Sequence, residues 1–246
     1  MVEDFHEHLR NQHLSSDVLD AFEKLLADSD YDMENLIEAV DGIESGSAAQ
    51  RALGFEIDEN LFQAVRVMRS EAEWFVQHAC ERLREIEAAH LWSAALRKVS
   101  EHDIAFVTTN YDRSIEIGCS YSGTELDDGF AAFDDREFTE WVGISSSAPI
   151  RLLKINGSTD WYQGADNSVY KLKHPMPLYG DLAVSGMGGD FPRMTSAIVL
   201  PTREKRVNQP PYPDLVTEFR IAAREANVAI FIGTSLRDPD LLDLCG

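Results

Sequence analysis

Apolar positions spaced three or four residues apart fill the first hundred residues of the chain. Residues 14–26 and 33–40 each predict a helix on this spacing, and the Gly- and Ser-rich segment 41–47 is expected to end the second. A longer pattern covers residues 59–100, which is the length of two helices or of one kinked helix. We therefore expect residues 1–100 to form a helical subdomain.

Past the first hundred residues, short apolar runs replace the helical spacing. Four of these runs are expected to be buried strands, and they span 104–107, 150–155, 197–200 and 228–232. Helices are predicted at 113–118 and 214–226, whereas 121–148 and 162–195 have the composition of long irregular loops. Strands that alternate with helices favour a mostly parallel sheet. The sequence thus predicts an α/β fold, with a Rossmann-like core at residues 101–246.

The formal net charge of -21 argues against binding to nucleic acid or to anionic membranes, because both require positive charge. Cys80, Cys119 and Cys245 are odd in number and far apart, so we expect neither disulfides nor a zinc ribbon, and no metal site. The chain shows no signal peptide and no apolar run of membrane-spanning length, which predicts a cytoplasmic protein.

Small, polar or turn-forming residues follow each predicted strand. They are Thr109–Asn110, Asn156–Ser158, Pro201–Thr202 and Gly233–Ser235. Because the carboxyl ends of parallel strands share one edge of a sheet, we expect these segments to surround a nucleotide-sized cleft. A plainer interpretation of the first of them is a helix cap, in which Asn110 or Asp112 binds backbone amides.

Three segments give this edge a family resemblance. TTNYD at 108–112, KINGSTDW at 154–161 and FIGTSLRDPD at 231–240 resemble, in order and spacing, the sirtuin-like (SIR2) fold, and most closely the SIR2-like NAD-consuming domains of bacterial anti-phage defence systems. The resemblance covers roughly residues 102–246. It implies a sirtuin-type Rossmann fold, NAD as the substrate, and cleavage of the bond between nicotinamide and ribose.

The resemblance also implies roles for individual residues. In the family, the first segment lines the nicotinamide-ribose pocket, and the third contacts ribose and phosphate. The catalytic positions correspond here to Asn110, Asp112 and Asn156. The NAD-binding positions correspond to Thr108, Thr109, Tyr111, Gly157, Ser158, Gly233, Thr234, Ser235 and Leu236.

Asn156 is a departure from the family pattern, in which a catalytic histidine precedes the Gly-Ser pair. Asparagine has no titratable nitrogen, so we expect a catalytically inactive chain. An engineered substitution and a natural loss of catalysis both explain Asn156. The first is favoured because the other motif residues match the family.

Other departures concern the ends of the domain and its metal. The family's Gly-rich phosphate loop is missing from the printed sequence, and the short final helix predicted after Asp238–Pro239 suggests that the parent chain continues. The zinc-binding cysteines of protein-deacetylating sirtuins are also missing, which disfavours deacetylation of protein lysines.

The leading functional hypothesis is an NAD glycohydrolase that depletes NAD during phage infection. The alternative is a module that senses NAD or ADP-ribose without turnover, and a third is a structural subunit with a vestigial cleft. The resemblance implies a homo-oligomer with an ATPase or Argonaute-like defence partner. Phe62, Trp74 and Phe75 are candidates for an oligomer surface in the helical region, although such residues more often belong to a core.

Overall fold

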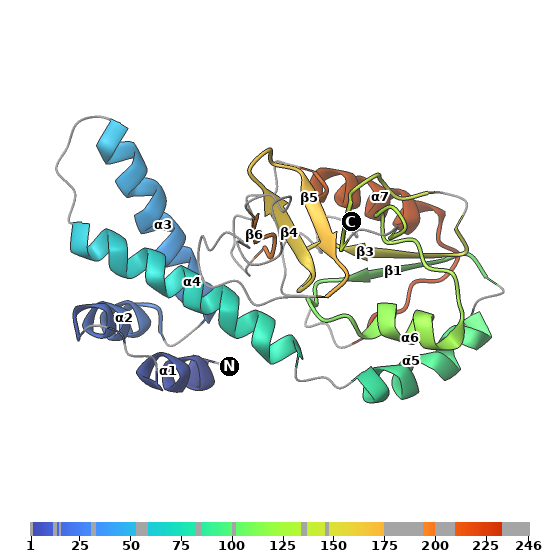
Figure 1. The fold of residues 1–246 in the computed structure, drawn as a ribbon, viewed down its shortest axis with the longest axis horizontal. Helices are drawn as coiled ribbons and strands as arrows, with labels where there is room; N and C mark the ends of the chain where they lie inside the picture. The colour runs from blue at the N-terminus through green and yellow to red at the C-terminus, as the bar shows by residue number, and fades with distance from the viewer. Residues whose placement is uncertain are drawn as a thin grey trace. The chain divides into compact units, whose positions relative to one another are not determined.

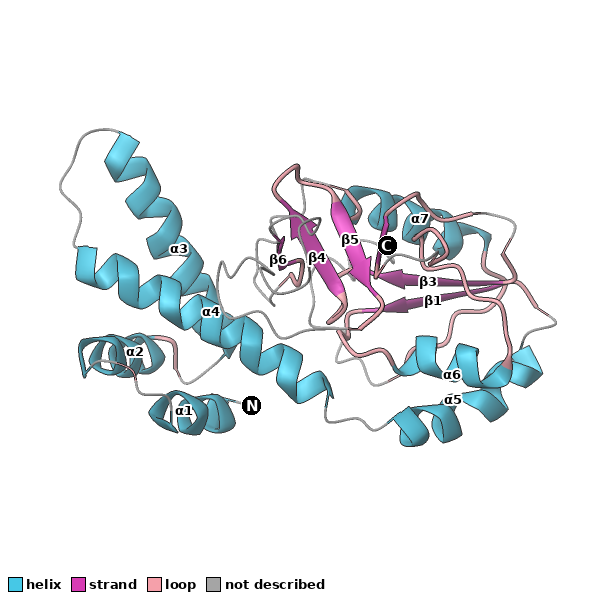
Figure 2. Cartoon of the chain, viewed as in Figure 1, coloured by secondary structure: helices cyan, strands magenta, loops and turns pink. Residues whose placement is uncertain are grey.

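A computed structural model describes residues 2–11, 14, 16–30, 33–52, 59–81, 85–99, 102–133, 137–145, 148–174, 194–199 and 210–232. These residues divide into two compact units, one up to Ala79 and the other from Cys80 onward. Figure 1 traces the chain from one end to the other, and Figure 2 separates its helices from its strands.

The first unit is helical. Its elements are α1 (Val2–Asn11), α2 (Ser16–Asp28), α3 (Met33–Ala52) and most of α4 (Glu59–Glu81). Aromatic and aliphatic side chains from all four helices form its core, with Phe5 of α1 against Phe22 of α2 in an edge-to-face contact at 5.7 Å between ring centroids. The predicted helices in this part of the sequence are confirmed.

The predicted end of the second helix at residues 41–47 is wrong, because α3 continues to Ala52. Gly42 and Gly46 lie inside the helix. A glycine costs a helix about 1 kcal/mol relative to alanine but does not break it, and no proline interrupts this segment. Buried Leu36, Ile37 and Val40 anchor the first half of the helix and offset that cost.

The long helical pattern at 59–100 is two helices, α4 and α5 (Glu85–Val99). This confirms the first of the two predicted arrangements. Helix α5 lies in the second unit, where it packs along α6 (Ser114–Ser122). The boundary between subdomain and core at residues 100 and 101 stays a prediction.

A pair of parallel strands is the centre of the second unit. β1 (Ile104–Thr108) pairs with β3 (Ile150–Lys154) in a register that runs from Ile104 opposite Ile150 to Thr108 opposite Lys154. These two predicted strands and their parallel direction are confirmed (Figure 1).

Helices cover both faces of this pair. Alternate residues of a strand point to opposite faces, so Leu152 packs with Leu96 of α5 and Ile115 of α6, whereas Leu153 packs with residues of α7 (Tyr212–Glu225), Leu215 among them. The result is a layer of helices, a layer of parallel strands and a second layer of helix, the α/β arrangement that the sequence predicts.

A second, antiparallel sheet was not expected from the sequence. β2 (Phe138–Glu140), β4 (Trp161–Gly164), β5 (Val169–Leu172) and β6 (Met194–Ser196) lie in the order β2-β5-β4-β6. Apart from Trp161 and Ser196, their residues fall in the two segments predicted as long loops, so that prediction is wrong for them. Strands of three or four residues are too short to show a clear alternation of apolar and polar positions.

Two of the four predicted strands are also wrong. Residues 197–199 are irregular and follow β6 directly, while residue 200 lies outside the described part. Residues 228–232 pair with no strand within the described part of the chain and are exposed, with Ile230 at 79% and Ile232 at 81% exposure. Apolar character alone does not make a strand, because a strand also needs a neighbour for its backbone groups.

Candidate functional site

The loop after β1 carries the first set of predicted site residues. The Thr108 hydroxyl accepts a hydrogen bond from the Asn110 amide at 3.0 Å, and the Asn110 side chain is exposed. The Asp112 carboxylate accepts a bond at 2.9 Å from the Ser114 amide, at the first residue of α6. The predicted bond from a backbone amide to Asp112 is therefore confirmed, although the N-cap residue of α6 is Arg113, which makes no side-chain cap bond.

The turn after β3 carries the second set. Gly157 has φ +84°, a left-handed conformation that side chains disfavour, and its amide donates to the Lys154 carbonyl at 3.0 Å. A Cβ at this position would lie 2.5 Å from the Ala197 carbonyl oxygen. The turn therefore requires glycine for its conformation and for the close approach of residue 197.

Hydrogen bonds join these two loops. The Ile155 amide donates to the Thr108 carbonyl at 3.1 Å, and the Thr159 amide donates to the Tyr111 carbonyl at 3.1 Å. The Ser158 hydroxyl also donates to the Tyr111 carbonyl, at 3.3 Å. The structure thus places the predicted residues of the first two motifs beside one another, at the carboxyl ends of β1 and β3.

Asn156 lies within this junction. Its side chain is 5% exposed, and its Nδ2 donates to the Thr109 carbonyl at 3.3 Å. Its Oδ1 is buried and accepts no hydrogen bond from any described residue. Buried acceptors without a donor are uncommon because each costs about 1–3 kcal/mol, so Oδ1 is an exception to the usual pairing of buried polar atoms.

A third segment, residues 197–199, closes one side of the site. The Tyr111 hydroxyl donates to the Val199 carbonyl at 2.7 Å, and the Val199 amide donates to the Asn156 carbonyl at 2.9 Å. Tyr212 of α7 donates its hydroxyl to the Ala197 carbonyl, and burial raises the pKa of Tyr212, which keeps this hydroxyl protonated. Sequence reasoning placed a strand here and missed this bracing role.

Buried charged side chains adjoin the two loops. Lys154, 1% exposed, pairs with Glu116 at 2.9 Å. Asp160 is fully buried and pairs with Arg113 at 3.1 Å. Burial alone would raise the pKa of the Asp160 carboxyl, but the positive charges of Lys171, Lys154 and Arg113 outweigh it and hold that pKa below its usual range.

A further buried pair adjoins Asp160. Lys171 pairs with Asp128, and its ammonium lies 4.0 Å from the Asp160 carboxylate. Burial acts to lower the pKa of Lys171, yet the neighbouring charges of Asp128, Asp160 and Glu116 raise it overall. Sequence reasoning missed these charges, because a lysine or aspartate in a chain gives no sign that it will be buried. The one available signal was the position of Lys154 and Asp160 at either end of the motif after β3.

The comparisons with known proteins bear on this arrangement. A family model described as SIR2-like domain matches residues 104–245, more than half of the chain. The chain belongs to the SIR2-like family. The matched segment contains both parallel strands and all three predicted motifs of this SIR2-like domain. The family resemblance predicted from these motifs is confirmed, and SIR2-like domains bind NAD. A search of curated proteins found no match.

Most of the third motif of the SIR2-like domain lies outside the described residues, including Gly233, Thr234, Ser235 and Leu236. Pro201–Thr202, at the third predicted strand end, also lie outside them. Their convergence with Asn110 and Asn156 stays a prediction.

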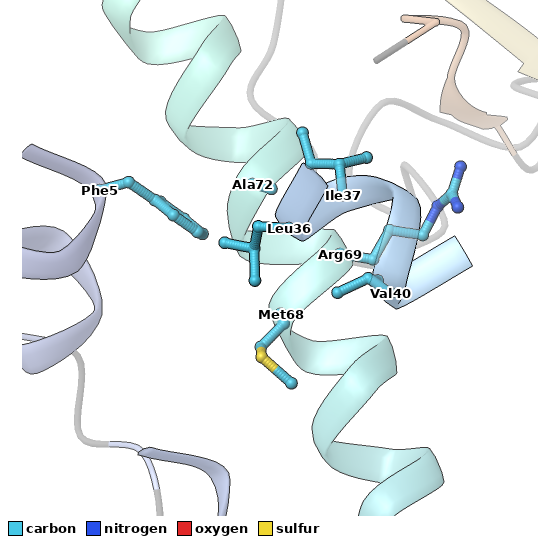
Figure 3. Close-up of a pocket in the computed structure, with 7 residues that line it drawn as sticks. All are labelled: Phe5, Leu36, Ile37, Val40, Met68, Arg69 and Ala72. Carbon is cyan, nitrogen blue, oxygen red and sulfur yellow. The ribbon is translucent and has the colours of Figure 1, made fainter. Parts of the chain in front are cut away.

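Two hollows of the described chain lie away from the predicted residues. One, of about 300 Å³, is in the SIR2-like domain between α6 and the loop that follows it, with Phe130 and the Lys171–Asp128 pair in its lining. The other, in the first unit, is lined by side chains of α1, α3 and α4 (Figure 3). Its volume of about 10 Å³ is close to the room that one water needs, so it is a packing gap.

Two searches of the described residues found nothing. No group of three or more His, Cys, Asp and Glu side chains among them is arranged to hold a metal ion. None of the described helices has the length and apolar character that a membrane crossing requires.

Proposed function

We propose that this chain binds NAD at the carboxyl ends of β1 and β3, and that the activity of its site is hydrolysis of the bond between nicotinamide and ribose. The observation that carries the proposal is the pair of tied loops with the unsatisfied Oδ1 of Asn156 between them. A carboxamide N–H or a ribose hydroxyl of NAD would donate to that oxygen. The family match supports the same ligand.

The reaction breaks the bond between ribose C1′ and the pyridinium nitrogen. The electron pair of that bond leaves with nicotinamide. A water oxygen then bonds to the cation-like C1′ and releases one proton, which gives ADP-ribose. Asn110, whose side chain is exposed at the loop after β1, is suited to hold the water or the carboxamide through its amide. Asp112 holds the loop through Oδ1, which accepts the Ser114 amide, and its carboxylate has further acceptor sites with which to support the water.

The proton of the attacking water needs an acceptor near neutral pH. A histidine at position 156 would provide one, whereas an asparagine does not. Loss of a general base costs roughly 10²- to 10⁴-fold in rate. We therefore expect this chain to bind NAD and to turn it over very slowly, as an inactive form of an NAD glycohydrolase.

The test is the release of nicotinamide from NAD by this chain and by Asn156→His. We expect the histidine variant to be faster by about 10²-fold or more. Asn156→Gln is the matched control, because it changes the size of the side chain without adding a base, and it should show no gain. Binding of NAD by both variants without any gain from histidine would refute the hydrolase proposal.

A sensor of NAD or ADP-ribose is the second candidate, and Asn156 is the observation that favours it. A binding module needs the hydrogen bonds of residue 156 and no base. Calorimetry with NAD and with ADP-ribose, beside the release assay, separates the candidates. Binding without release in both this chain and Asn156→His favours the sensor, and no binding of either nucleotide favours a structural subunit.

The biological setting is proposed from the family resemblance. Hydrolysis of NAD in the cytoplasm would deplete the cofactor of an infected cell, as an anti-phage defence. Activity of this kind needs control, and assembly of several copies with an ATPase or Argonaute-like partner would provide it. Light scattering of the purified protein tests the assembly, and a single copy at all concentrations would contradict it.

A further inference from the structure

We infer that Lys154 is a positioning residue, which sets the shape of the nucleotide site without touching the nucleotide. The inference rests on the proposed function, since it assigns a task within the same site. It concerns the loop that carries Asn110 and the turn that carries Asn156, both described above.

The lysine ammonium is the point at which the two loops meet. Nζ of Lys154, the last residue of β3, donates to the Ser158 hydroxyl at 2.7 Å in the turn after its own strand. It also donates to the carbonyl of Asp112, and at 3.4 Å to that of Tyr111, in the loop after β1. Glu116 Oε1, in α6, is a fourth acceptor at 2.9 Å, so the three N–H groups of the ammonium are shared among four acceptors. One side chain thus connects both site loops and the first turn of α6.

The bonds to successive carbonyls fix the loop around Asn110. At one side of Asn110, the Thr108 carbonyl is held by the Ile155 amide at 3.1 Å. At the other side, the Tyr111 and Asp112 carbonyls face the Lys154 ammonium. The two adjacent peptide groups direct their carbonyl oxygens at one cation. Rotation of either peptide plane is therefore restricted. Asn110 is therefore held from both sides by contacts that its own exposed side chain does not make.

The charge of Lys154 distinguishes positioning from packing. A buried ammonium costs several kcal/mol unless it is paired, and apolar residues of similar size often replace a buried pair with no loss of stability. Lys154 and Glu116, at 1% and 9% side-chain exposure, form such a pair. What an apolar replacement cannot supply is a donor for the Asp112 carbonyl and for the Ser158 hydroxyl, whereas the Tyr111 carbonyl keeps the Thr159 amide. That difference makes the inference testable.

The first comparison is Lys154→Met against Lys171→Met. Both changes remove a buried ammonium that is paired with a carboxylate, but Lys171 pairs with Asp128. We would measure ADP-ribose binding by calorimetry, unfolding by denaturant, and amide hydrogen exchange over residues 108–114 and 155–160. Lys154→Met should weaken binding about tenfold or more and raise exchange in both segments, because small errors in position are costly at a site. Lys171→Met should lose comparable stability with binding changed less than about threefold.

The second comparison is the experiment to use if the Lys154→Met variant does not fold. The double variant K154M/E116L removes both charges, so it should recover stability while binding stays weak and exchange in the two loops stays high. In the Asn156→His background, the K154M/E116L substitutions should lower kcat for nicotinamide release at saturating NAD. Recovery of both stability and binding in the double variant would overturn the inference.

Failure of the proposed function gives a different result. If the chain without substitutions binds neither NAD nor ADP-ribose, the proposed function fails. The exchange measurements still decide whether Lys154 ties the loops. If amide hydrogen exchange in the two loops of the double variant equals that of the unsubstituted chain, Lys154 does not hold the loops together. This outcome would overturn the inference whether or not a nucleotide binds.

Discussion

The side-chain amide of Asn156 donates at 3.3 Å to the carbonyl of Thr109, which lies 47 residues earlier in the chain. This bond crosses from the turn after β3 to the loop after β1. It uses the Nδ2 group of Asn156 and leaves Oδ1 buried without a donor among the described residues. The two halves of one amide therefore differ, because Nδ2 holds the strand ends together and Oδ1 has no donor among the described residues.

Asn156→Asp should separate those two halves. A carboxylate cannot donate to the Thr109 carbonyl, and burial penalises its charge, so we expect a loss of about 2–3 kcal/mol in the free energy of unfolding at neutral pH. Burial raises the folded pKa of such a carboxyl above its unfolded value, so part of the loss should return as the pH falls and the group is protonated. Denaturant unfolding of this variant and of the parent, at neutral pH and at pH 5, measures both effects. Equal stability at neutral pH would contradict the prediction.

Gly157→Ala should destabilise the site turn. The new Cβ would meet the Ala197 carbonyl oxygen at 2.5 Å, and the residue would remain at φ +84°. We expect a loss of about 3 kcal/mol by thermal or denaturant unfolding. Gly123→Ala is the matched control, because Gly123 has φ +68° with no atom within 4 Å of the added Cβ. Its cost should be about 1 kcal/mol, from conformation alone, and equal losses in the two variants would show that the contact with residue 197 does not matter.

Asp160→Asn should cost about 3 kcal/mol at neutral pH, because it leaves the charges of Arg113 and Lys171 next to a neutral amide. The folded pKa of Asp160 is lowered, so its contribution to stability is fully present above the unfolded value of 3.8 and is lost as the pH falls through the folded pKa. The difference in unfolding free energy between the parent and D160N should therefore be constant from pH 5 to 8 and shrink below about pH 4. A difference that does not change with pH would assign the loss to packing instead of charge.

The sequence was sufficient where the signal is local and continuous. The apolar run at 104–107, with small polar residues after it, predicts β1 and the loop at its end, and the run at 150–155 predicts β3 in the same way. Both strands lie between helical layers, so most of their positions are apolar, and the two charged residues of β3, Arg151 and Lys154, do not hide the run. The motifs that follow them were recognisable for the same reason, since each is a short unbroken segment.

Pairings between distant residues were out of reach. Lys154 and Glu116 are 38 residues apart, and Tyr111 and Val199 are 88 apart, so neither contact leaves a trace in a local window. The strands β4, β5 and β6 are each three or four residues long and gain their stability from one another. The run at 228–232 shows the reverse case, in which a strong local pattern has no pairing strand in the described part of the molecule.

Backbone groups hold most of the frame around residue 156. The amides of Ile155, Gly157 and Val199 bind carbonyls of Thr108, Lys154 and Asn156, and none of these bonds depends on the side chain at 156. A neutral side chain there can consequently be exchanged while its surroundings keep their form. On the proposed function, one codon within such a frame would separate a chain that consumes NAD from one that only detects it.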